Sequence, residues 1–458
     1  MNEYDIILIG TGQATGTILP PLLKNGKKVA VIERNKVGGT CVNWGCTPTK
    51  ALVKSAKVAY TIQNSSKFGV ISPSFEVDFP LVMKRVNDMR ENGENGFREW
   101  LKKDTHFYNG TASFIDEHTI HIDGTQSADI KGKTIIIHTG AKASIPPIDG
   151  IGDIPYLTNR EIFSLSDLPK HLIIIGGSYI SLEFSQMFAR FGSCVTILER
   201  GERLIKREDK DISSIAKGIL EDEGIIINLN SSVDKVETKD EEVIIHFTMN
   251  GTKKKIQGSH LLIATGREPQ TDFLTLENTS IELDAKGYIK TNKYGQTNHP
   301  HIYALGDVNG KGAFTHTSVD DGLVFLDHYF KKGERTIDQR VPTYALYIDP
   351  PLARCGINEQ QAIQENKEIL IAHMDMKDVS RAKEKGETKG KMKVVVDANS
   401  KELLGASIFG VGGDEIIGML ALLISSHLPY SFLQHTLIPH PTVGELIPFM
   451  LDSLSPPK

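Results

Sequence analysis

The sequence predicts an α/β protein with two Rossmann-like dinucleotide-binding domains followed by a C-terminal α+β domain. Two strand–turn–helix–strand units with glycine-containing turns, one near the N-terminus and one in the middle of the chain, predict the first two domains. In each unit an acidic residue ends the second strand, Glu33 in the first and Glu199 in the second. The length of 458 residues fits this division, since domains of about 150 residues each give three.

The first unit has the features of a dinucleotide site. Its first strand, residues 5–9, is continuously apolar, as expected for a parallel strand that is buried on both faces. The turn after it contains Gly10 and Gly12, which permit a tight turn and a close approach of the backbone to a pyrophosphate at the helix N-terminus. The second strand, residues 28–32, runs into Glu33, whose carboxylate can accept hydrogen bonds from both ribose hydroxyls.

The second unit repeats this order with serines in its turn. A strand over residues 171–175 leads to Gly176, and Ser178 and Ser181 replace the second and third glycines of the motif. Serine is small and can donate a hydrogen bond to a phosphate, so dinucleotide binding is still expected. Two dinucleotide sites imply hydride transfer between two dinucleotides. A fold whose second site is unused is the alternative.

The segment 38–50 contains Cys41 and Cys46 directly after the first unit. Two close thiols beside a nucleotide site suggest a redox-active disulfide that receives electrons from the cofactor. Half of a zinc site is the alternative, but zinc sites usually add a second Cys or His pair. Cys194 and Cys355 stand alone in apolar runs and are predicted to be ordinary buried thiols. No metal site is expected.

A helix is predicted over residues 48–59, which places both redox cysteines at its N-terminal end. The helix dipole favours a thiolate over a thiol at this end. Lys50 follows Cys46 by one helical turn and can therefore face the same cofactor.

A second group with catalytic chemistry is His440 with Glu445. Proline follows His440 and restrains its backbone, while Glu445 has a spacing that allows its carboxylate to orient the imidazole. An oriented imidazole is the general acid–base that thiol chemistry requires.

Composition excludes several classes of function. The net charge of −5 argues against a nucleic-acid-binding protein, which would have an excess of basic residues. No apolar stretch is long enough to span a membrane without polar interruption, and the N-terminus has no cleavable apolar leader. A cytoplasmic location is therefore expected. The lysine-rich segment 377–393 has mixed charge and is predicted to be a solvated loop.

The motif Gly-Gly-Thr-Cys-Val-Asn-x-Gly-Cys-x-Pro-x-Lys over residues 38–50 resembles the signature of group I pyridine nucleotide-disulfide oxidoreductases. This family includes dihydrolipoamide dehydrogenase, glutathione reductase and mercuric reductase. Residues 264–267, 304–307 and 440–445 also resemble family segments, in the family's order, and the likeness covers essentially the whole chain. The resemblance implies FAD at the first unit, a nicotinamide at the second, and a homodimer whose active site is shared between subunits.

The resemblance also implies the domain boundaries. The FAD-binding domain would be split between residues 1–145 and 266–335, with the NAD(P)-binding domain inserted as residues 146–265. Residues 340–458 would form the dimerisation domain. The Pro- and Gly-containing segment 145–150 is itself typical of a boundary.

By the same resemblance, hydride from NADH passes through FAD to the Cys41–Cys46 disulfide and then to a disulfide or a small oxidant. Cys46 would be the thiol nearest the flavin, and Cys41 would exchange with the substrate. Lys50 would pair with Glu183 beside the flavin, and Tyr179 would gate the nicotinamide pocket. His440 and Glu445 would reach the cysteines of the other subunit.

The implied cofactor-binding residues come from both units and from the segments that follow them. They are Gly10, Gly12, Gln13, Ala14, Glu33, Gly39, Thr40, Lys50, Ala112, Thr139, Gly140, Gly176, Ser178, Tyr179, Ile180, Glu199, Val233, Gly266, Arg267, Asp307 and Thr315.

The choice of nicotinamide depends on the end of the second unit. An acid there favours a free ribose, so Glu199 favours NADH over NADPH. Arg200, Arg203 and Lys206 follow closely, so binding of NADPH is also possible. Glutathione reductases usually carry basic residues at this position, and Glu199 weighs against that subgroup.

Three alternatives remain for the function that follows reduction of the disulfide. The chain ends without the C-terminal cysteine pair of detoxifying mercuric reductases and large thioredoxin reductases. Residues 314–322 and 349–356, with Trp44 and Thr47, resemble a mercuric-reductase-like branch that lacks these cysteines and whose members reduce small oxidants, such as hypothiocyanous acid, or metal ions. Dihydrolipoamide dehydrogenase proper is the second alternative, and a flavoprotein redox sensor without turnover is the third.

Overall fold

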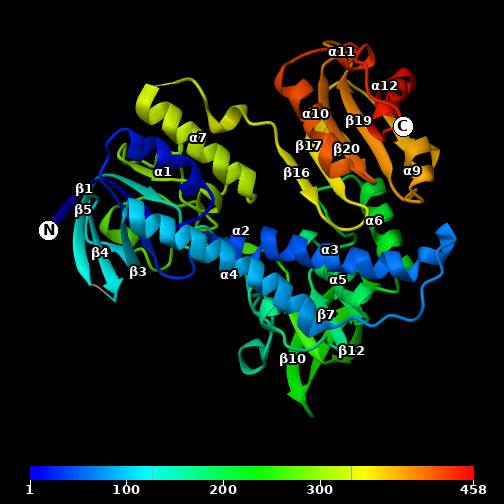
Figure 1. Cartoon of the computed structure of the whole chain (residues 1–458), viewed down its shortest axis with the longest axis horizontal. Coiled ribbons are helices and arrows are strands. Elements are labelled where there is room, and N and C mark those ends of the chain that lie inside the picture. Colours follow the sequence, from blue (N-terminus) through cyan, green and yellow to red (C-terminus); the bar gives the residue numbers. More distant parts are fainter. Residues whose placement is uncertain (126, 332, 458) are drawn as a thin grey trace.

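The computed structural model describes residues 1–125, 127–331 and 333–457. It confirms the predicted α/β class, with one mainly parallel sheet, one parallel sheet and a C-terminal antiparallel sheet, each at the centre of a lobe (Figure 1). The N-terminus lies in the first lobe and the C-terminus in the third. Among the described residues, no helix is both long and apolar enough to cross a membrane.

The first lobe is built on parallel strands in the order β3–β2–β1–β5–β15, and β4 pairs antiparallel with β3 and β5. Alternate residues of β1 point to opposite faces, so Ile6 and Leu8 pack against α1 and α7 while Ile7 and Ile9 pack against the other face. The elements are β1 (Asn2–Ile9), α1 (Ala14–Lys24), β2 (Val29–Glu33), β3 (His106–Phe114), β4 (Thr119–Gly124), β5 (Ala128–Ile137), β15 (Ile302–Ala304) and α7 (Thr315–Lys331).

The second lobe repeats the parallel arrangement with the order β13–β7–β8–β9. An antiparallel sheet, β10–β11–β12, packs against it, and the two sheets share one apolar core. Helix α5 begins at Tyr179, directly after the glycine turn. The elements are β7 (His171–Ile175), α5 (Tyr179–Phe191), β8 (Cys194–Leu198), α6 (Lys210–Asp222), β9 (Ile226–Asn228), β10 (Ser231–Lys239), β11 (Glu242–Met249), β12 (Thr252–Gly258) and β13 (His260–Ile263).

The third lobe is an antiparallel sheet in the order β16–β17–β20–β19–β18, and α10 packs on it. The remaining short elements are α2 (Gly39–Trp44), β6 (Ala141–Ala143), β14 (Arg267–Pro269), α8 (Glu359–Gln364), α11 (Ser431–Gln434) and α12 (Ile447–Met450). The elements of the lobe itself are β16 (Thr343–Leu346), β17 (Leu352–Gly356), β18 (Ile369–Asp375), α9 (Ser380–Glu384), β19 (Lys391–Asp397), β20 (Leu403–Phe409) and α10 (Gly413–Ser425).

The prediction of a solvated loop over residues 377–393 is wrong in part. The segment contains α9 and the start of β19, and Lys393 is buried. Its ammonium pairs with Asp209 at 2.9 Å and also with Glu359, which compensates the charge for its loss of water. The C-terminal end of this mixed-charge segment therefore contributes to a contact between the second and third lobes.

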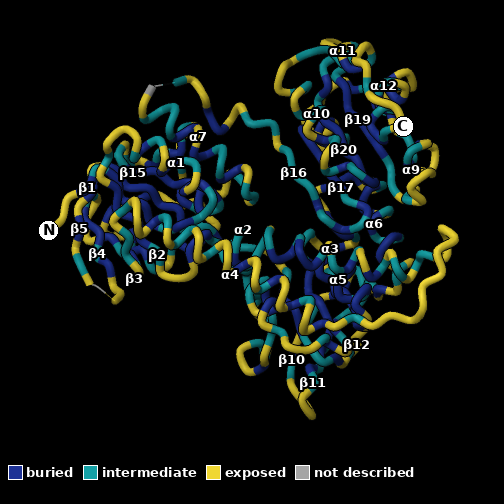
Figure 2. Tube along the Cα trace, viewed as in Figure 1, coloured by how far each residue is buried: buried dark blue, intermediate teal, exposed yellow. Residues whose placement is uncertain are grey.

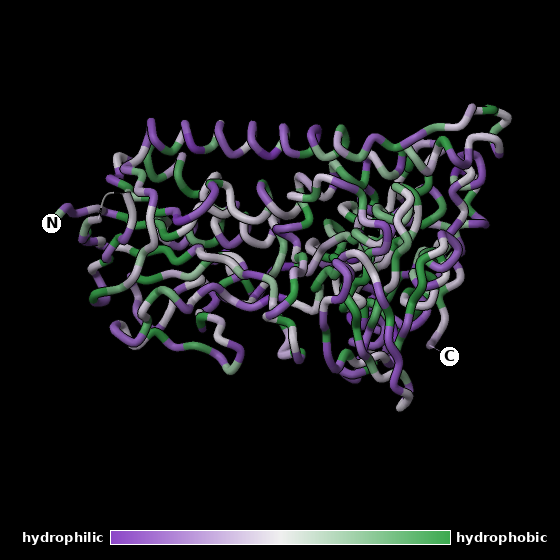
Figure 3. The backbone as a smooth tube through the Cα atoms, turned by 90° about the horizontal axis from the view of Figure 1, so that it is seen from below, coloured by the Kyte–Doolittle hydropathy of each residue, from purple (hydrophilic) through white to green (hydrophobic). Residues whose placement is uncertain are grey.

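Helices α3 (Cys46–Gln63) and α4 (Phe79–Asp104) connect the lobes. Both pack against α5 in a single apolar core that also includes Leu346 and Leu352 of the third lobe. Figure 2 shows this buried zone where α3, α5 and β17 meet. α4 buries few side chains along its 26 residues and runs along one edge of the molecule as a largely hydrophilic helix (Figure 3).

Candidate active site

The first glycine turn has the geometry predicted for a phosphate-binding loop. Gly10 has a φ of +97°, and a Cβ there would lie 2.3 Å from the carbonyl oxygen of His138. A Cβ on Gly39 would lie 3.1 Å from Cα of Gly12, so two backbone segments meet without side chains between them. The Glu33 carboxylate accepts hydrogen bonds from the backbone N–H and the hydroxyl of Thr11, at 3.0 and 2.7 Å, which fixes the acid at the edge of the loop.

The redox cysteines lie on two consecutive helices. Cys41 is in α2, and Cys46 is the first residue of α3, a helix of 18 residues. Gly45 separates the helices, and a Cβ on it would lie 2.9 Å from the carbonyl oxygen of Thr40. The small residue allows the chain to turn back so that both sulfurs approach the N-terminal end of α3, where the helix dipole stabilises negative charge.

The two thiols have opposite protonation preferences. The Cys41 thiol donates a hydrogen bond to Cys46 and, together with the Thr315 hydroxyl and the Lys50 charge, lowers the pKa of Cys46 to about 6. The Thr315 oxygen lies 3.2 Å from the Cys46 sulfur. Sharing its proton with Cys46, and burial, raise the pKa of Cys41 above its ordinary value. In the reduced pair, Cys46 is therefore the thiolate and Cys41 carries the proton.

Lys50 forms an ion pair with Glu183 of α5, with its ammonium 2.9 and 3.0 Å from the two carboxylate oxygens. The Glu183 side chain is buried, and the backbone N–H of Tyr347 donates to it at 2.9 Å. The Tyr347 ring lies 4.5 Å from the Lys50 ammonium. Tyr347 was not predicted from the sequence, since nothing near it in the chain marks it as part of a site.

A single cavity brings most of the predicted residues together. The predicted residues that line it are Gly10, Gly12, Gln13, Glu33, Gly39, Thr40, Cys41, Cys46, Lys50, Ala112, Thr139, Gly140, Ile180, Glu183, Arg267, Asp307 and Thr315. Ala14, Gly266, Gly176, Ser178, Tyr179, Glu199 and Val233 are not among its lining residues.

The residues of this cavity fit FAD. The side-chain-free glycine turn at the N-terminus of α1 suits a pyrophosphate, and Glu33 suits a ribose. Asp307 also lines the cavity, where its ion pair with Arg267 at 2.5 Å fixes a carboxylate that suits the hydroxyl groups of a polyol chain. The thiols lie in the same cavity, so an isoalloxazine ring and a disulfide can approach each other.

His138 is a further cavity residue that the sequence did not reveal. Its Nδ1–H donates to the carbonyl oxygen of Leu305 at 2.8 Å, and Nε2 faces the Ser318 hydroxyl at 3.4 Å. A Cβ on Gly12 would lie 2.3 Å from Nε2, so the imidazole packs directly against the backbone of the phosphate-binding turn. Burial lowers the pKa of His138, which keeps the ring neutral.

The second glycine turn is also formed as predicted. Gly176 has a φ of +111°, and a Cβ there would lie 2.4 Å from the carbonyl oxygen of Ala264. Ser178 is exposed at the start of α5, and the Glu199 carboxylate accepts from the N–H of Gly201 at 2.6 Å. Val233 is half-buried in β10. The turn, the helix N-terminus and the acid thus meet at one end of the second parallel sheet.

His440 and Glu445 contact each other but not the cavity. The Nδ1 of His440 lies 3.0 and 3.2 Å from the two carboxylate oxygens of Glu445. The Glu445 side chain is 13% exposed, whereas that of His440 is 79% exposed. Because the carboxylate accepts at Nδ1, the exposed Nε2 is the nitrogen that is free to accept a proton.

The prediction for the two lone cysteines is half wrong. Cys355 is buried, as expected, but Cys194 is exposed, since it is the first residue of β8 and lies at the end of this inner strand. Apolar neighbours in the sequence indicate a buried strand but not the exposure of its first residue. Within the described part of the chain, no group of three or more His, Cys, Asp and Glu side chains has the geometry of a metal site.

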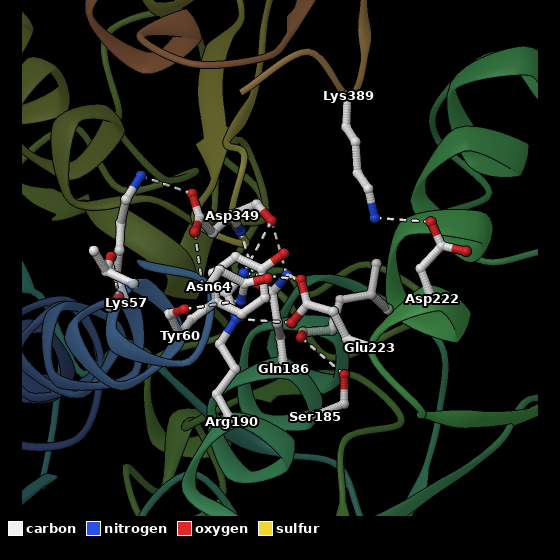
Figure 4. A network of polar contacts seen from close by, with 12 residues as sticks. Lys57, Tyr60, Asn64, Ser185, Gln186, Arg190, Asp222, Glu223, Asp349 and Lys389 are labelled. Carbon is white, nitrogen blue, oxygen red and sulfur yellow. Dashed lines mark hydrogen bonds and ion pairs between the residues drawn. The ribbon is translucent and has the colours of Figure 1, made fainter. Parts of the chain in front are cut away.

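A largely buried polar network contacts the later turns of α3, at Lys57 and Tyr60 (Figure 4). Arg190 of α5 binds Glu223 through two hydrogen bonds of 2.7 and 2.8 Å and the Asp349 carboxylate through one of 2.8 Å. Lys57 of α3 donates to the same Asp349 at 2.9 Å, and the Arg190 guanidinium stacks 3.9 Å from the ring of Tyr60. The network therefore fixes the helix that carries Cys46 and Lys50 to the other two lobes.

Comparison with known proteins agrees with this geometry. Residues 4–322 match the family model described as pyridine nucleotide-disulphide oxidoreductase, and residues 342–450 match the dimerisation domain of the same family. The probable pyridine nucleotide-disulfide oxidoreductase RclA of Escherichia coli (strain K12) is 35% identical over 451 residues, which cover 97% of this chain and 98% of that protein.

Other relatives are also similar over most of the chain. A mercuric reductase of Staphylococcus aureus is 32% identical over 97% of this chain and 81% of its own length. A dihydrolipoyl dehydrogenase of Bacillus subtilis (strain 168) is 30% identical over 96% of both. The solved structure of the Cu(II) complex of the HOCl-induced flavoprotein disulfide reductase RclA from Escherichia coli superposes with a TM-score of 0.90, at 33% identity, over 99% of each chain.

Proposed function

Since the chain belongs to the pyridine nucleotide-disulphide oxidoreductase family, we propose that it transfers electrons from NADH through FAD to the Cys41–Cys46 pair and then to a small oxidant or disulfide. The chain is a flavoprotein of the disulfide reductase type. The observation that carries the proposal is the Cys46 thiol, with a pKa lowered to about 6, in the cavity that also contains the first glycine turn.

FAD, when bound, supplies two-electron transfer between the nicotinamide and the disulfide. Gly10, Gly12 and Gln13 of the cavity lining, with Ala14 as the first residue of α1, would hold its pyrophosphate, and Glu33 and Asp307 would hold its hydroxyl groups. The Lys50–Glu183 pair places a positive charge beside the thiols. This charge and the Thr315 hydroxyl stabilise the Cys46 thiolate when the disulfide opens.

The thiols then reduce the substrate in two balanced steps. For a disulfide substrate, the Cys41 sulfur loses its proton, forms a bond to one substrate sulfur and expels the other as a thiolate. The Cys46 thiolate attacks the Cys41 sulfur, releases the second substrate thiolate and restores the Cys41–Cys46 disulfide. The pair loses two electrons and the substrate gains them. Of the two protons that the leaving thiolates take up, one comes from Cys41 through the base and the other from solvent.

Proton transfer in the first step is the proposed role of His440. The raised pKa of Cys41 means that this thiol needs a base before it can attack. His440 is exposed, is oriented by Glu445 through Nδ1 and has a free Nε2. We assign it to the cysteines of the partner in a homodimer, in agreement with the dimerisation domain at residues 342–450 and with the absence of His440 from this chain's own cavity lining.

We propose NADH as the preferred electron donor and residues 176–180 with Glu199 and Val233 as its binding site. The Glu199 carboxylate stands at the end of β8, where it favours a ribose hydroxyl over a phosphate. Tyr179, the first residue of α5, is the proposed gate to the nicotinamide pocket. NADPH binding through the nearby basic residues is the alternative that the titration below separates.

The domain division proposed with this function follows the sheets. The FAD-binding domain comprises residues 1–145 and 266–335, and its two pieces meet where β15 pairs with β5. The NAD(P)-binding domain comprises residues 146–265, and the dimerisation domain comprises residues 340–458. Gly266 lies at the second junction, where β14 pairs with β6.

The test is an anaerobic titration of the FAD-loaded protein with NADH and with NADPH, followed by addition of acceptors. Lipoamide, hypothiocyanous acid and Cu(II) are suitable acceptors, and wild type is compared with Cys41→Ser and with Cys194→Ser. We expect reduction by NADH and turnover with a small oxidant that is lost in Cys41→Ser and kept in Cys194→Ser. Fast, saturable turnover with lipoamide would instead identify a dihydrolipoamide dehydrogenase. Reduction of the flavin by a nicotinamide, without turnover of any acceptor, would indicate a redox sensor.

A further inference from the structure

The cavity that contains the thiols has an excess of positive charge. Three carboxylates line it, against five cationic side chains, which are those of Arg34, Lys36, Lys50, Arg160 and Arg267. The one histidine of the lining, His138, is kept neutral by burial. The diphosphate bridge of FAD carries one negative charge on each phosphate, so the excess matches the charge that this cofactor brings.

Most of the five cations have partners or water. Lys50 and Arg267 each form an ion pair with a carboxylate of the cavity. Arg34 donates to the side-chain oxygen of Gln270 at 2.6 Å, and Lys36 is exposed. Arg160 differs, since it is half-buried and its guanidinium has no hydrogen-bond or ion-pair partner among the described residues. Five N–H donors are therefore left without an acceptor from the protein.

Arg160 is held in the cavity by an aromatic ring. The carbon at the centre of its guanidinium lies 4.5 Å from the centroid of the Trp44 ring. The preceding residue, Asn159, donates from its side-chain amide to the carbonyl oxygen of Trp44 at 3.0 Å. An indole ring offers no acceptor atom, so the contact orients the guanidinium without using its N–H groups. Trp44 itself lies in the loop between Cys41 and Cys46.

The position of Arg160 corresponds to the middle of a bound FAD. Glu33 suits the ribose at one end of the cavity, and the thiols mark the end that suits the flavin ring. Arg160 contacts Trp44 beside the thiols, and it is also near enough to Glu33 for that charge to act on it. Burial lowers the pKa of Arg160, as expected for a cation that has lost water without gaining an acceptor. Between the ribose and the flavin, the charged part of FAD is its diphosphate.

We propose that Arg160 is a further cofactor-binding residue, whose guanidinium binds the diphosphate of FAD while it packs on Trp44 and thereby fastens the loop between the redox cysteines to the cofactor. The inference rests on the proposed function, in which this cavity holds FAD. Arg160 precedes β7, so the second lobe contributes a group to the cofactor site of the first. No motif of the sequence indicates this role.

The chemistry of the two groups fits this role. A guanidinium is planar and presents its donors as a fork that matches two phosphate oxygens, and such charge-assisted bonds are stronger than those between neutral groups. A half-buried cation without an acceptor is costly, and a phosphate that accepts its hydrogen bonds removes this cost. The Trp44 ring fixes the guanidinium beforehand, which lowers the entropy lost on binding.

The experiment measures release of FAD from the purified, FAD-loaded full chain after dilution, as the rise of free-flavin fluorescence at a fixed temperature. Arg160→Gln removes the charge, Arg160→Lys keeps the charge without the fork, and Trp44→Leu removes the ring. Arg381→Gln is the matched control, because this arginine of α9 pairs with Glu384 and is not among the lining residues. The KM for an anionic disulfide, dithiobisnitrobenzoate, is measured in the same variants.

We expect Arg160→Gln to release FAD about tenfold faster than the wild type, the factor set by one hydrogen bond between charged groups. Arg160→Lys should fall between the two, because a point charge remains near the diphosphate. Trp44→Leu should speed release about threefold through loss of the cation–π contact. Arg381→Gln should release FAD at the wild-type rate.

Release from Arg160→Gln at the wild-type rate would overturn the inference, and a raised KM for the anionic disulfide in that variant would then assign the guanidinium to the substrate. Equal acceleration in Arg160→Gln and Arg160→Lys would assign Arg160 to packing and not to charge. Unchanged release from Trp44→Leu would disprove the link to the cysteine loop. If Arg160→Gln fails to fold, Arg160→Lys and Trp44→Leu still decide. A wild type that cannot be loaded with FAD would contradict the proposed function itself.

Discussion

At the scale of single residues, the protein gives two chemically identical thiols different pKa values. Cys41 and Cys46 start from the same ordinary pKa, and their surroundings drive the values apart. A helix N-terminus, a hydroxyl and an ammonium all surround Cys46, whereas Cys41 is left with a thiolate neighbour and burial. This asymmetry gives one sulfur the role of a stabilised leaving group and the other the role of a nucleophile that requires a base.

Replacing Thr315 with alanine should raise the pKa of Cys46 from about 6 to about 7, because the thiolate loses a hydrogen bond of the charged kind. The rate of alkylation of Cys46 by iodoacetamide, followed by peptide mass spectrometry across pH, measures this pKa. Thr315→Ser keeps the hydroxyl and should keep the wild-type value. Equal shifts in both variants would show that the hydroxyl does not act on the thiol.

His138 should make the folded state sensitive to acid. Its pKa is lowered by burial, so below about pH 6.5 the unfolded chain takes up a proton that the folded chain does not. Stability is therefore lost as the pH falls from about 6.5 toward the folded pKa, with a slope of up to about 1.4 kcal/mol per pH unit.

Urea denaturation of the His138→Gln variant at pH 7.5 and pH 5.5 tests this dependence. The variant should lose less stability on acidification than the wild type does. His435→Gln, at an exposed position, should behave as the wild type. A variant with the full wild-type loss would assign the acid sensitivity to other groups.

At the scale of elements, α3 connects the thiol site to the polar network between the second and third lobes. Its first turn carries Cys46 and Lys50, and its later turns carry Lys57 and Tyr60, which contact Asp349 and Arg190. α5 lies alongside it and presents Glu183, Gln186 and Arg190 on one face, at spacings of three and four residues. The position of the thiol is therefore set by contacts along the whole length of the helix.

Removing Arg190 from this network should be strongly destabilising. Arg190→Leu leaves the buried carboxylates Glu223 and Asp349 without their guanidinium, so the free energy of unfolding should fall by about 3–5 kcal/mol. The measurement is denaturant unfolding of the two proteins.

The matched control is Lys84→Ala, which breaks the exposed pair between Lys84 and Asp88 on α4. It should change the free energy of unfolding by less than about 1 kcal/mol. A loss in Arg190→Leu as small as that of the control would show that the network adds no stability.

At the scale of the whole molecule, the cavity and the His440–Glu445 pair belong to different lobes. The cavity lies at the meeting of the first two lobes, whereas His440 lies in the third and is exposed. The family's dimerisation domain covers residues 342–450, and a second copy is the proposed source of the base for each cysteine pair. One active site would then need residues of two chains.

Mixing two inactive variants should restore activity if the site is shared. Random reassociation of Cys41→Ser with His440→Gln forms about half mixed dimers, and each has one intact site of two, so about a quarter of the wild-type NADH-dependent activity should return. A mixture of Cys41→Ser with Cys46→Ser creates no intact site and should stay inactive. Absence of recovery in the first mixture, with exchange shown by native mass spectrometry, would place the complete site within one chain.

Much of the site is predictable from the sequence because its parts are local. The glycine turns with their terminal acids and the cysteine segment lie within short stretches whose spacing is set by a strand, a turn or a helix. Cys194 shows the limit of this reasoning, because its apolar neighbours indicate a buried strand while its own exposure depends on where the strand starts. Lys393 shows the opposite error, since its carboxylate partners Asp209 and Glu359 lie far away in the chain.

The sequence by itself determined the α/β class, the order of the three lobes and the pair of redox cysteines, since periodicity and motif spacing are properties of neighbouring residues. Only the tertiary structure decided that His138 supports the first turn and that Glu208 binds Tyr179, and it supplied the physical cause of the thiolate at Cys46, which the resemblance had implied. These features depend on burial and on charges brought together from distant parts of the chain. Electrostatic interactions in an apolar interior are set by distance in space, which spacing along the chain does not fix.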